Sequence, residues 1–159
     1  MRFAKLTLTT HRIPGLVVTS AAVFALSACG ASSLPTLSGF AAVRDQAART
    51  EAAAAARATQ LADIATDCAS CSSALRDVAS SSQARLEALG GLWDPWGGVT
   101  PEGQSAPAAV SEAPTDVSAY VSWLARTATR DLEIAANPDK TSAEEARTLG
   151  AAALGRYAS

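Results

Sequence analysis

Apolar and small residues recur every three or four positions from Phe40 to Leu89, a stretch without proline or glycine. Residues spaced in this way lie on one face of an α-helix, so the pattern predicts a helix with one apolar stripe. Gly90-Gly91 follows the last stripe residue and is placed to end the helix. The stripe comprises Phe40, Val43, Ala47, Thr50, Ala54, Leu61, Ile64, Cys68, Cys71, Leu75, Val78, Ser82, Leu86 and Leu89.

This stretch could form one helix or two. Thr66-Asp67 and the serines of 70–73 are residue types that could cap a second helix. The apolar stripe nevertheless crosses them without losing phase, and we therefore expect one long or kinked helix of about 75 Å, at 1.5 Å per residue. A break near Asp67 would divide it.

Residues 90–114 predict a loop, because glycine and proline are frequent in them. Its first part carries Trp93 and Trp96, separated by Asp94-Pro95. We expect the two indoles to fold back as a lid on the end of the bundle near Leu89 and Leu92. The alternative is that they are rigid aromatic contacts for a partner, either an envelope protein or a glycan.

Two shorter helices follow the loop. The first begins at Thr115, a good N-cap, and ends before Asn137-Pro138. Its helical spacing places Tyr120 and Trp123 in the core. The second opens with a capping-box pattern at 142–145. The sequence therefore predicts an all-α fold, a three- or four-helix bundle with a long first helix and a Gly/Pro/Trp loop.

The N-terminus has the order of an export signal. A basic segment with Arg2, Lys5 and Arg12 precedes an apolar run from Leu16 to Leu26, which is too short to span a membrane as a helix. The run ends in Leu-Ser-Ala-Cys, the pattern of a bacterial lipobox, in which Cys29 receives the lipid.

The lipobox predicts three segments: a signal peptide at 1–28, the lipidated Cys29 (palmitate or a similar acyl chain) with its linker at 29–39, and a helical domain at 40–159. It places the protein at the cell membrane, on the outer, extracytoplasmic face, held by its lipid anchor. Cleavage would remove three of the 13 basic residues and none of the 15 acidic ones, leaving a net charge near −5. That charge argues against nucleic acid as a partner.

The residue inventory excludes several chemistries. The only histidine, His11, lies in the predicted signal, so the mature chain would have neither imidazole metal ligands nor a histidine-activated nucleophile. The glutamates do not follow the spacing of a di-iron bundle, and no phosphate-binding glycine loop is present. We therefore expect no metal, no cofactor and no enzyme activity.

The remaining reactive motif is Cys68-Ala69-Ser70-Cys71. Its i,i+3 spacing is within disulfide range, and disulfides persist outside the cytoplasm. Because both cysteines lie on the apolar stripe, we expect a local structural disulfide or two buried thiols. Redox activity is the alternative, and it would require exposed sulfurs at a helix N-terminus.

The lipobox, the alanine-rich helices, the Cys-x-x-Cys motif and the segment "LEALGGLWDPWGG" followed by "APTD" resemble small lipoproteins of high-GC Gram-positive bacteria. These are uncharacterised, and some similar proteins are associated with ferritin-like helical domains. The resemblance implies an envelope compartment and an α-helical bundle. The function expected from the sequence is a non-catalytic, membrane-anchored lipoprotein that binds or spaces another envelope component. A thiol-disulfide redox protein is the alternative.

Overall fold

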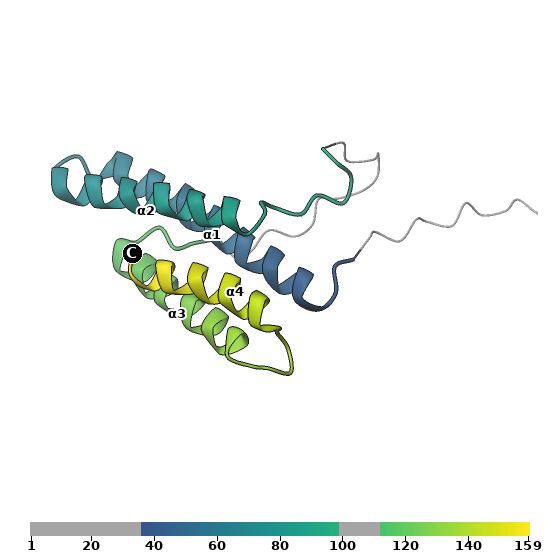
Figure 1. The fold of residues 1–159 in the computed structure, drawn as a ribbon. Coiled ribbons are helices and arrows are strands. Elements are labelled where there is room, and N and C mark those ends of the chain that lie inside the picture. The colour runs from purple at the N-terminus through teal and green to yellow at the C-terminus, as the bar shows by residue number, and fades with distance from the viewer. Residues whose placement is uncertain (1–35, 99–111) are drawn as a thin grey trace, which may run out of the picture. The chain divides into compact units, whose positions relative to one another are not determined.

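The computed structural model describes residues 36–98 and 112–159, and within them it contains four α-helices and no strand (Figure 1). They are α1 (Gly39–Ile64), α2 (Ala69–Ala88), α3 (Val117–Ala135) and α4 (Ala143–Tyr157). The predicted all-α bundle with a long first helix is confirmed. The predicted signal peptide and Cys29 lie outside the described residues.

The preferred single helix from Phe40 to Leu89 is wrong, because the chain reverses at residues 65–68. Leu61 of α1 and Leu75 of α2 are buried in the same core cluster, which requires the two helices to lie side by side. The three- and four-residue spacing of the apolar stripe continues across the turn because the part of the stripe on α1 and the part on α2 face the same core. A continuous helix would instead carry half of the stripe away from that core.

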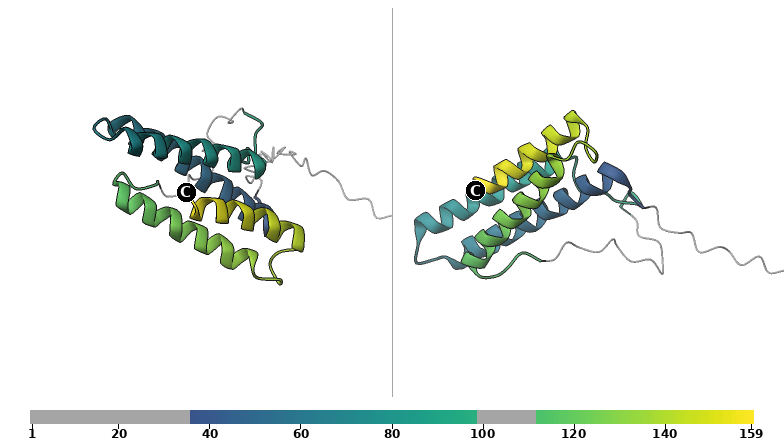
Figure 2. Two further views of the ribbon diagram at one scale, coloured as in Figure 1. Left: turned by 60° about the vertical axis from the view of Figure 1, so that its left-hand side comes forward. Right: turned by 90° about the horizontal axis from the view of Figure 1, so that it is seen from below.

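The helices pair as two hairpins, α1 with α2 and α3 with α4, and the second hairpin packs on the first (Figure 2). Both connections are short, as is usual between antiparallel neighbouring helices. The starts of α3 and α4 are determined by residues at their own N-termini. The side chain of Asp116, and not that of the expected Thr115, caps α3. The capping box of Ser142 and Glu145 at the start of α4 is confirmed.

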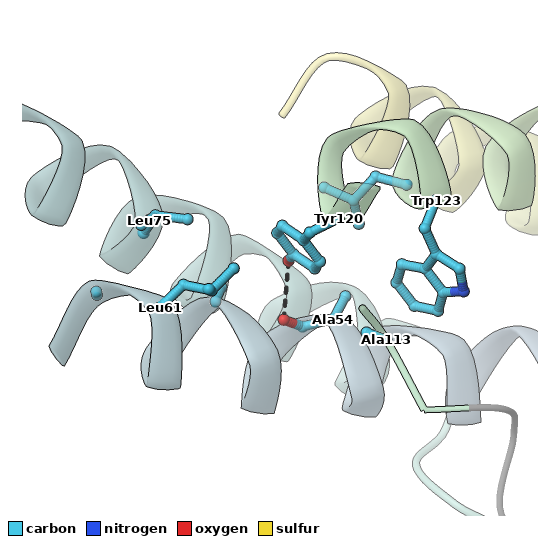
Figure 3. Close-up of a cluster of buried hydrophobic side chains, with 9 residues drawn as sticks. Ala54, Leu61, Leu75, Ala113, Tyr120 and Trp123 are labelled. Atoms are coloured by element: carbon cyan, nitrogen blue, oxygen red, sulfur yellow. Dashed lines mark hydrogen bonds between the residues drawn. The ribbon is translucent and has the colours of Figure 1, made fainter. Parts of the chain in front are cut away.

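The core consists mainly of alanine, with few large side chains. Ala54 and Ala58 of α1 are fully buried, and small residues of this kind allow helices to approach closely. Tyr120 and Trp123 of α3 supply much of the volume and stack with their ring centroids 6.1 Å apart (Figure 3). The Tyr120 hydroxyl donates to the Ala54 carbonyl at 2.9 Å. The predicted core positions of these two aromatics are confirmed.

A second core cluster joins α1, α2 and α4. Its buried members are Ala47, Ala48, Leu89, Leu149 and Ala152. In the part of the chain that the structure describes, no helix combines the length and the apolar character needed to cross a bilayer.

Candidate functional sites

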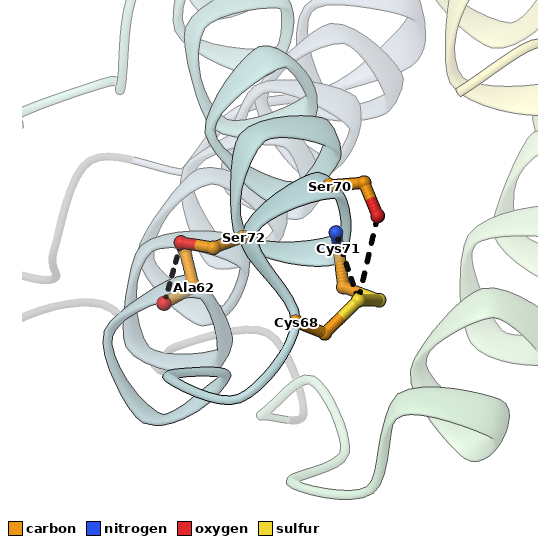
Figure 4. Close-up of a disulfide and its surroundings, with 5 residues drawn as sticks. All are labelled: Ala62, Cys68, Ser70, Cys71 and Ser72. Carbon is orange, nitrogen blue, oxygen red and sulfur yellow. Dashed lines mark hydrogen bonds between the residues drawn. A yellow bond between two sulfur atoms is a disulfide. The ribbon is translucent and has the colours of Figure 1, made fainter.

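Cys68 and Cys71 form a disulfide at the start of α2 (Figure 4). Their S–S distance is 2.02 Å and their Cα atoms are 5.2 Å apart. Cys71 is exposed and Cys68 is half-buried, so the expected burial on the apolar stripe is wrong. The physical reason is the reversal at 65–68, which turns the middle of a supposed long helix into the N-terminal turn of α2.

The sulfur of Cys68 lies at the N-terminus of α2, where backbone N–H groups have no partner within the helix. Cys68 is the N-cap of α2, and its Sγ accepts the backbone N–H of Cys71 at 3.2 Å. The Ser70 hydroxyl is 3.5 Å from the same sulfur. The N-terminus of a helix carries partial positive charge, which favours a negative group there. This arrangement would stabilise a thiolate at Cys68 after the disulfide is reduced.

The turn before α2 is also held by hydrogen bonds that do not involve sulfur. The buried Ser72 hydroxyl donates to the Ala62 carbonyl of α1 at 2.9 Å, as Figure 4 shows. The Ser72 N–H donates to the Cys68 carbonyl at 3.0 Å, and the Cys68 N–H to the Ala65 carbonyl at 3.3 Å. The chain reversal thus has support of its own, independent of the S–S bond.

The first part of the loop, residues 90–98, is fixed on α1 through its backbone. Gly90 and Gly91 adopt positive φ of 90° and 76°, the region that glycine adopts readily, and so turn the chain out of α2. The Trp93 N–H then donates to Asp45 Oδ1 at 2.9 Å, and Arg49 Nη2 donates to the Trp93 carbonyl at 3.2 Å. The segment is therefore held in a defined position.

The tryptophan rings of this loop are half-buried, and neither belongs to a buried core cluster. Leu89 is buried against residues of α1 and α4. Leu92, which was expected beneath a lid, is 49% exposed. Part of the apolar surface of the loop thus faces solvent, and a role of Trp93 and Trp96 in contacting a partner stays a prediction.

A buried ionic cluster, which the sequence reasoning missed, links all four helices. The Arg156 guanidinium of α4 donates to Glu51 of α1 at 2.8 and 2.9 Å and to Asp131 of α3 at 3.0 Å. Arg85 of α2 donates to the other oxygen of Glu51 at 3.1 Å. Glu51, Asp131 and Arg156 are each at most 1% exposed. The cluster fixes the register of the helices by pairing charges of opposite sign.

A signal for this cluster existed in the sequence. Glu51 lies between Ala47 and Ala54, next to the stripe residue Thr50 of α1, and Asp131 and Arg156 follow core residues of their helices at similar spacing. Charges at three core positions, two acidic and one basic, must be paired, because an isolated buried charge is strongly unfavourable. Their partners could be identified only after the helices were placed.

The pKa of Tyr120 is raised to about 12, mainly by burial and also by the negative charge of Glu51, while the positive charge of Arg85 acts in the opposite direction. The hydroxyl is therefore a stable donor to Ala54, and its role is structural.

The raised pKa of Tyr120 predicts an alkaline loss of stability. The folded-state value lies above the ordinary value of 10, so this contribution is complete below pH 10 and is lost as the pH rises from 10 to about 12. The full loss is about 2–3 kcal/mol above pH 12, and about half of it is expected at pH 11, midway between the two pKa values. Urea unfolding of the wild type and Tyr120→Phe at pH 8 and pH 11 measures it. An equal pH dependence in both proteins would contradict the assignment to Tyr120.

A surface groove of about 270 Å³ runs along α1. Alanines such as Ala53 form its floor, and Leu92 and Ala113 stand at its edge. Its two arginines are already engaged, Arg49 with the loop and Arg57 with the Ala113 carbonyl at 2.8 Å. The groove therefore combines an apolar alanine surface with two engaged arginines and the carboxylate of Glu112.

Metal chemistry finds little support in the described residues. Within 36–98 and 112–159, no group of three or more His, Cys, Asp or Glu side chains could hold a metal ion. The two buried carboxylates, Glu51 and Asp131, are occupied by arginine donors.

No family model matches the chain, and comparisons with characterised proteins and with solved structures found no match either. The functional proposals therefore depend on the residues of this chain.

Proposed function

We propose that the chain is an extracytoplasmic lipoprotein, tethered to the outer face of the cell membrane by lipid on Cys29, whose helical bundle binds or spaces another envelope component. The observation that carries the proposal is Leu26-Ser27-Ala28-Cys29 at the end of a short apolar run behind a basic N-terminus. This order of charge, apolar run and cysteine is the one that lipid-attaching enzymes of bacteria process.

The length of the tether supports a position close to the membrane. α1 begins at Gly39, ten residues after Cys29. A chain of that length reaches at most about 35 Å when fully extended. The bundle would thus remain within about one bilayer thickness of the membrane surface.

The core supports a binding or spacing role. In the described part of the chain, no buried side-chain nitrogen or oxygen lacks a hydrogen-bond partner. The ionic cluster is thus fully engaged in joining α1 to α4. A core of this kind gives a rigid body and leaves no buried polar group free for a substrate.

The loop of residues 90–98 is the proposed contact surface. It combines an exposed Leu92 with two half-buried tryptophans on a backbone fixed to α1. Aromatic side chains on a fixed backbone bind at a low entropic cost, and tryptophan is enriched among residues that dominate binding energy. The partner would be an envelope protein or a glycan.

The anchor is tested by replacing Cys29 with alanine. We expect the variant to lose incorporation of a radiolabelled fatty acid and to leave the membrane fraction, because the acceptor sulfur is gone. Cys71→Ser is the matched control and should be labelled like the wild type. Fatty-acid label that persists on Cys29→Ala would refute the anchor.

The contact surface is tested with a photocrosslinking amino acid placed at Trp96 or, as a control, at the exposed Asp77 of α2. In intact cells we expect one species of defined mass to be crosslinked from position 96 and not from position 77. Leu92→Ser should weaken that crosslink, because it removes neighbouring apolar surface. Equal crosslinking from both positions would refute a specific surface at the loop.

A further inference from the structure

The Cys68–Cys71 disulfide is accessible to a thiol from solvent. Cys71 is exposed, and the intervening Ala69 and Ser70 are small and exposed as well. Access is one of the conditions that decide whether an incoming thiolate can attack a disulfide. Structural disulfides of small domains are more often enclosed by the core that they stabilise, whereas here the S–S bond lies outside both core clusters.

The two sulfurs are not equivalent. Cys68 Sγ accepts the Cys71 N–H at 3.2 Å, has the Ser70 hydroxyl at 3.5 Å and lies at the N-terminus of α2. Each of these features favours a thiolate at Cys68. A thiol that is stabilised as its thiolate is the better leaving group in disulfide exchange. Cys71 is the more exposed residue of the two, so its sulfur is the one assigned to attack by an incoming thiolate.

We expect the fold to depend little on the bond. The hydrogen bonds of Ser72 and of the Cys68 N–H hold the turn, and the ring that the disulfide closes spans only three residue steps. A short ring removes little entropy from the unfolded chain, so the stabilisation expected from this disulfide is small. Ile64, 73% exposed, ends α1 just before the turn and adds an apolar side chain for a polypeptide to contact.

We propose that Cys68–Cys71 is a thiol-disulfide exchange site that oxidises pairs of cysteine thiols in extracytoplasmic polypeptides, with Cys71 as the attacked sulfur and Cys68 as the leaving sulfur. This activity goes beyond the anchoring and binding role, and it rests on the proposed function only for the extracytoplasmic location.

The exchange proceeds in two steps. A substrate thiolate attacks Cys71 Sγ, the Cys68–Cys71 bond breaks, a substrate–Cys71 disulfide forms, and Cys68 leaves as a thiolate held by the Cys71 N–H. The second substrate thiolate then attacks the substrate sulfur of the mixed disulfide, and Cys71 leaves. The substrate loses two electrons and gains a disulfide, while the cysteine pair becomes a dithiol and takes up the two protons that the substrate thiols released. A low-molecular-weight disulfide regenerates the pair by the same exchange in reverse.

The test uses the full-length chain with Cys29→Ser, so that only the pair reacts. The probe is a reduced synthetic peptide with two cysteines, and peptide disulfide and protein thiols are quantified by mass spectrometry after acid quenching. We expect one peptide disulfide per protein, formed at least about tenfold faster than with equimolar oxidised glutathione, because the leaving sulfur is stabilised. Cys68→Ser with Cys71→Ser should keep its helical circular dichroism and form none. Oxidation no faster than with glutathione would overturn the proposal.

The roles assigned to Cys68 and Cys71 are tested by identifying which cysteine forms the mixed disulfide with the peptide. Quenched mixtures should contain peptide bonded to Cys71, and trapping at Cys68 alone would overturn the assignment.

Ser70→Ala should slow the exchange several-fold with an unchanged melting temperature, whereas Ser70→Thr should restore the rate. Ser73→Ala, on the exposed side of the same turn, is the matched control and should leave the rate unaltered. Equal rates in all four proteins would exclude a positioning role for Ser70.

Discussion

Replacing Arg156 with methionine is expected to lower the free energy of unfolding by about 3–5 kcal/mol, one of the largest single effects in the chain. The methionine fills much of the same space, so the loss is electrostatic. Arg156 donates to both Glu51 and Asp131, and both carboxylates are buried. Without the guanidinium, the basic partners left within the described residues are Arg130 for Asp131, with a side chain 41% exposed, and Arg85 for Glu51.

Urea unfolding followed by circular dichroism measures this effect. Arg147→Met is the matched control, since Arg147 is exposed on α4, and it should change the stability by no more than about 0.5 kcal/mol. The triple variant Glu51→Leu, Asp131→Leu, Arg156→Met should regain much of the loss, because the three fully buried charges are removed together. Arg85 and Arg130 lose their carboxylates, but both side chains reach solvent. An Arg156→Met variant as stable as the wild type would show that the cluster is solvated in solution.

The parts of the fold that local signals determine could be predicted from the sequence. The capping box at Ser142 and the proline after Asn137 act within a few residues, and α3 and α4 begin and end close to the predicted positions. The all-helical class followed from the spacing of apolar residues, which does not depend on how the helices are arranged. Tyr120 and Trp123 were placed in the core on the same basis.

The turn at 65–68 could not be decided from periodicity. Both a continuous helix and a hairpin preserve the phase of the apolar stripe when both arms of the hairpin face one core. The deciding interaction is the Ser72 hydroxyl bond to the Ala62 carbonyl, a contact between two helices. That error also displaced the cysteines, which were assigned to the buried face, whereas at the start of α2 Cys71 is exposed and Cys68 is half-buried.

The ionic cluster shows a second limit of sequence reasoning. The sequence analysis considered the glutamates only as metal ligands and did not consider Asp131 or Arg156, although Glu51, Asp131 and Arg156 each occupy a core position of their helix. Glu51 and Arg156 are 105 positions apart in the chain, so no local pattern connects them. Only the packing of α4 against α1 brings them together. Charged residues at positions otherwise occupied by alanines were the sequence feature that could have indicated buried charges.

Trp123→Ala is expected to lower the free energy of unfolding by about 3–5 kcal/mol, since it removes the largest side chain of the first core cluster. The indole is 7% exposed and stacks on Tyr120. Except for Leu61, the buried α1 residues of this cluster are alanines, which have no rotamers with which to fill the space left behind. The hole therefore remains as a cavity, and its cost adds to the lost burial.

Two other variants provide the comparison for the stability of Trp123→Ala. Val121→Ala, at an exposed position of the same helix, should change the stability by no more than about 0.5 kcal/mol. Trp96→Ala should cost about 1 kcal/mol or less, because its half-buried indole belongs to neither core cluster. A Trp96→Ala loss as large as that of Trp123→Ala would mean that the loop does form a lid on the bundle. The contact surface proposed for residues 90–98 would then be refuted, because a tryptophan committed to the core has no free face for a partner.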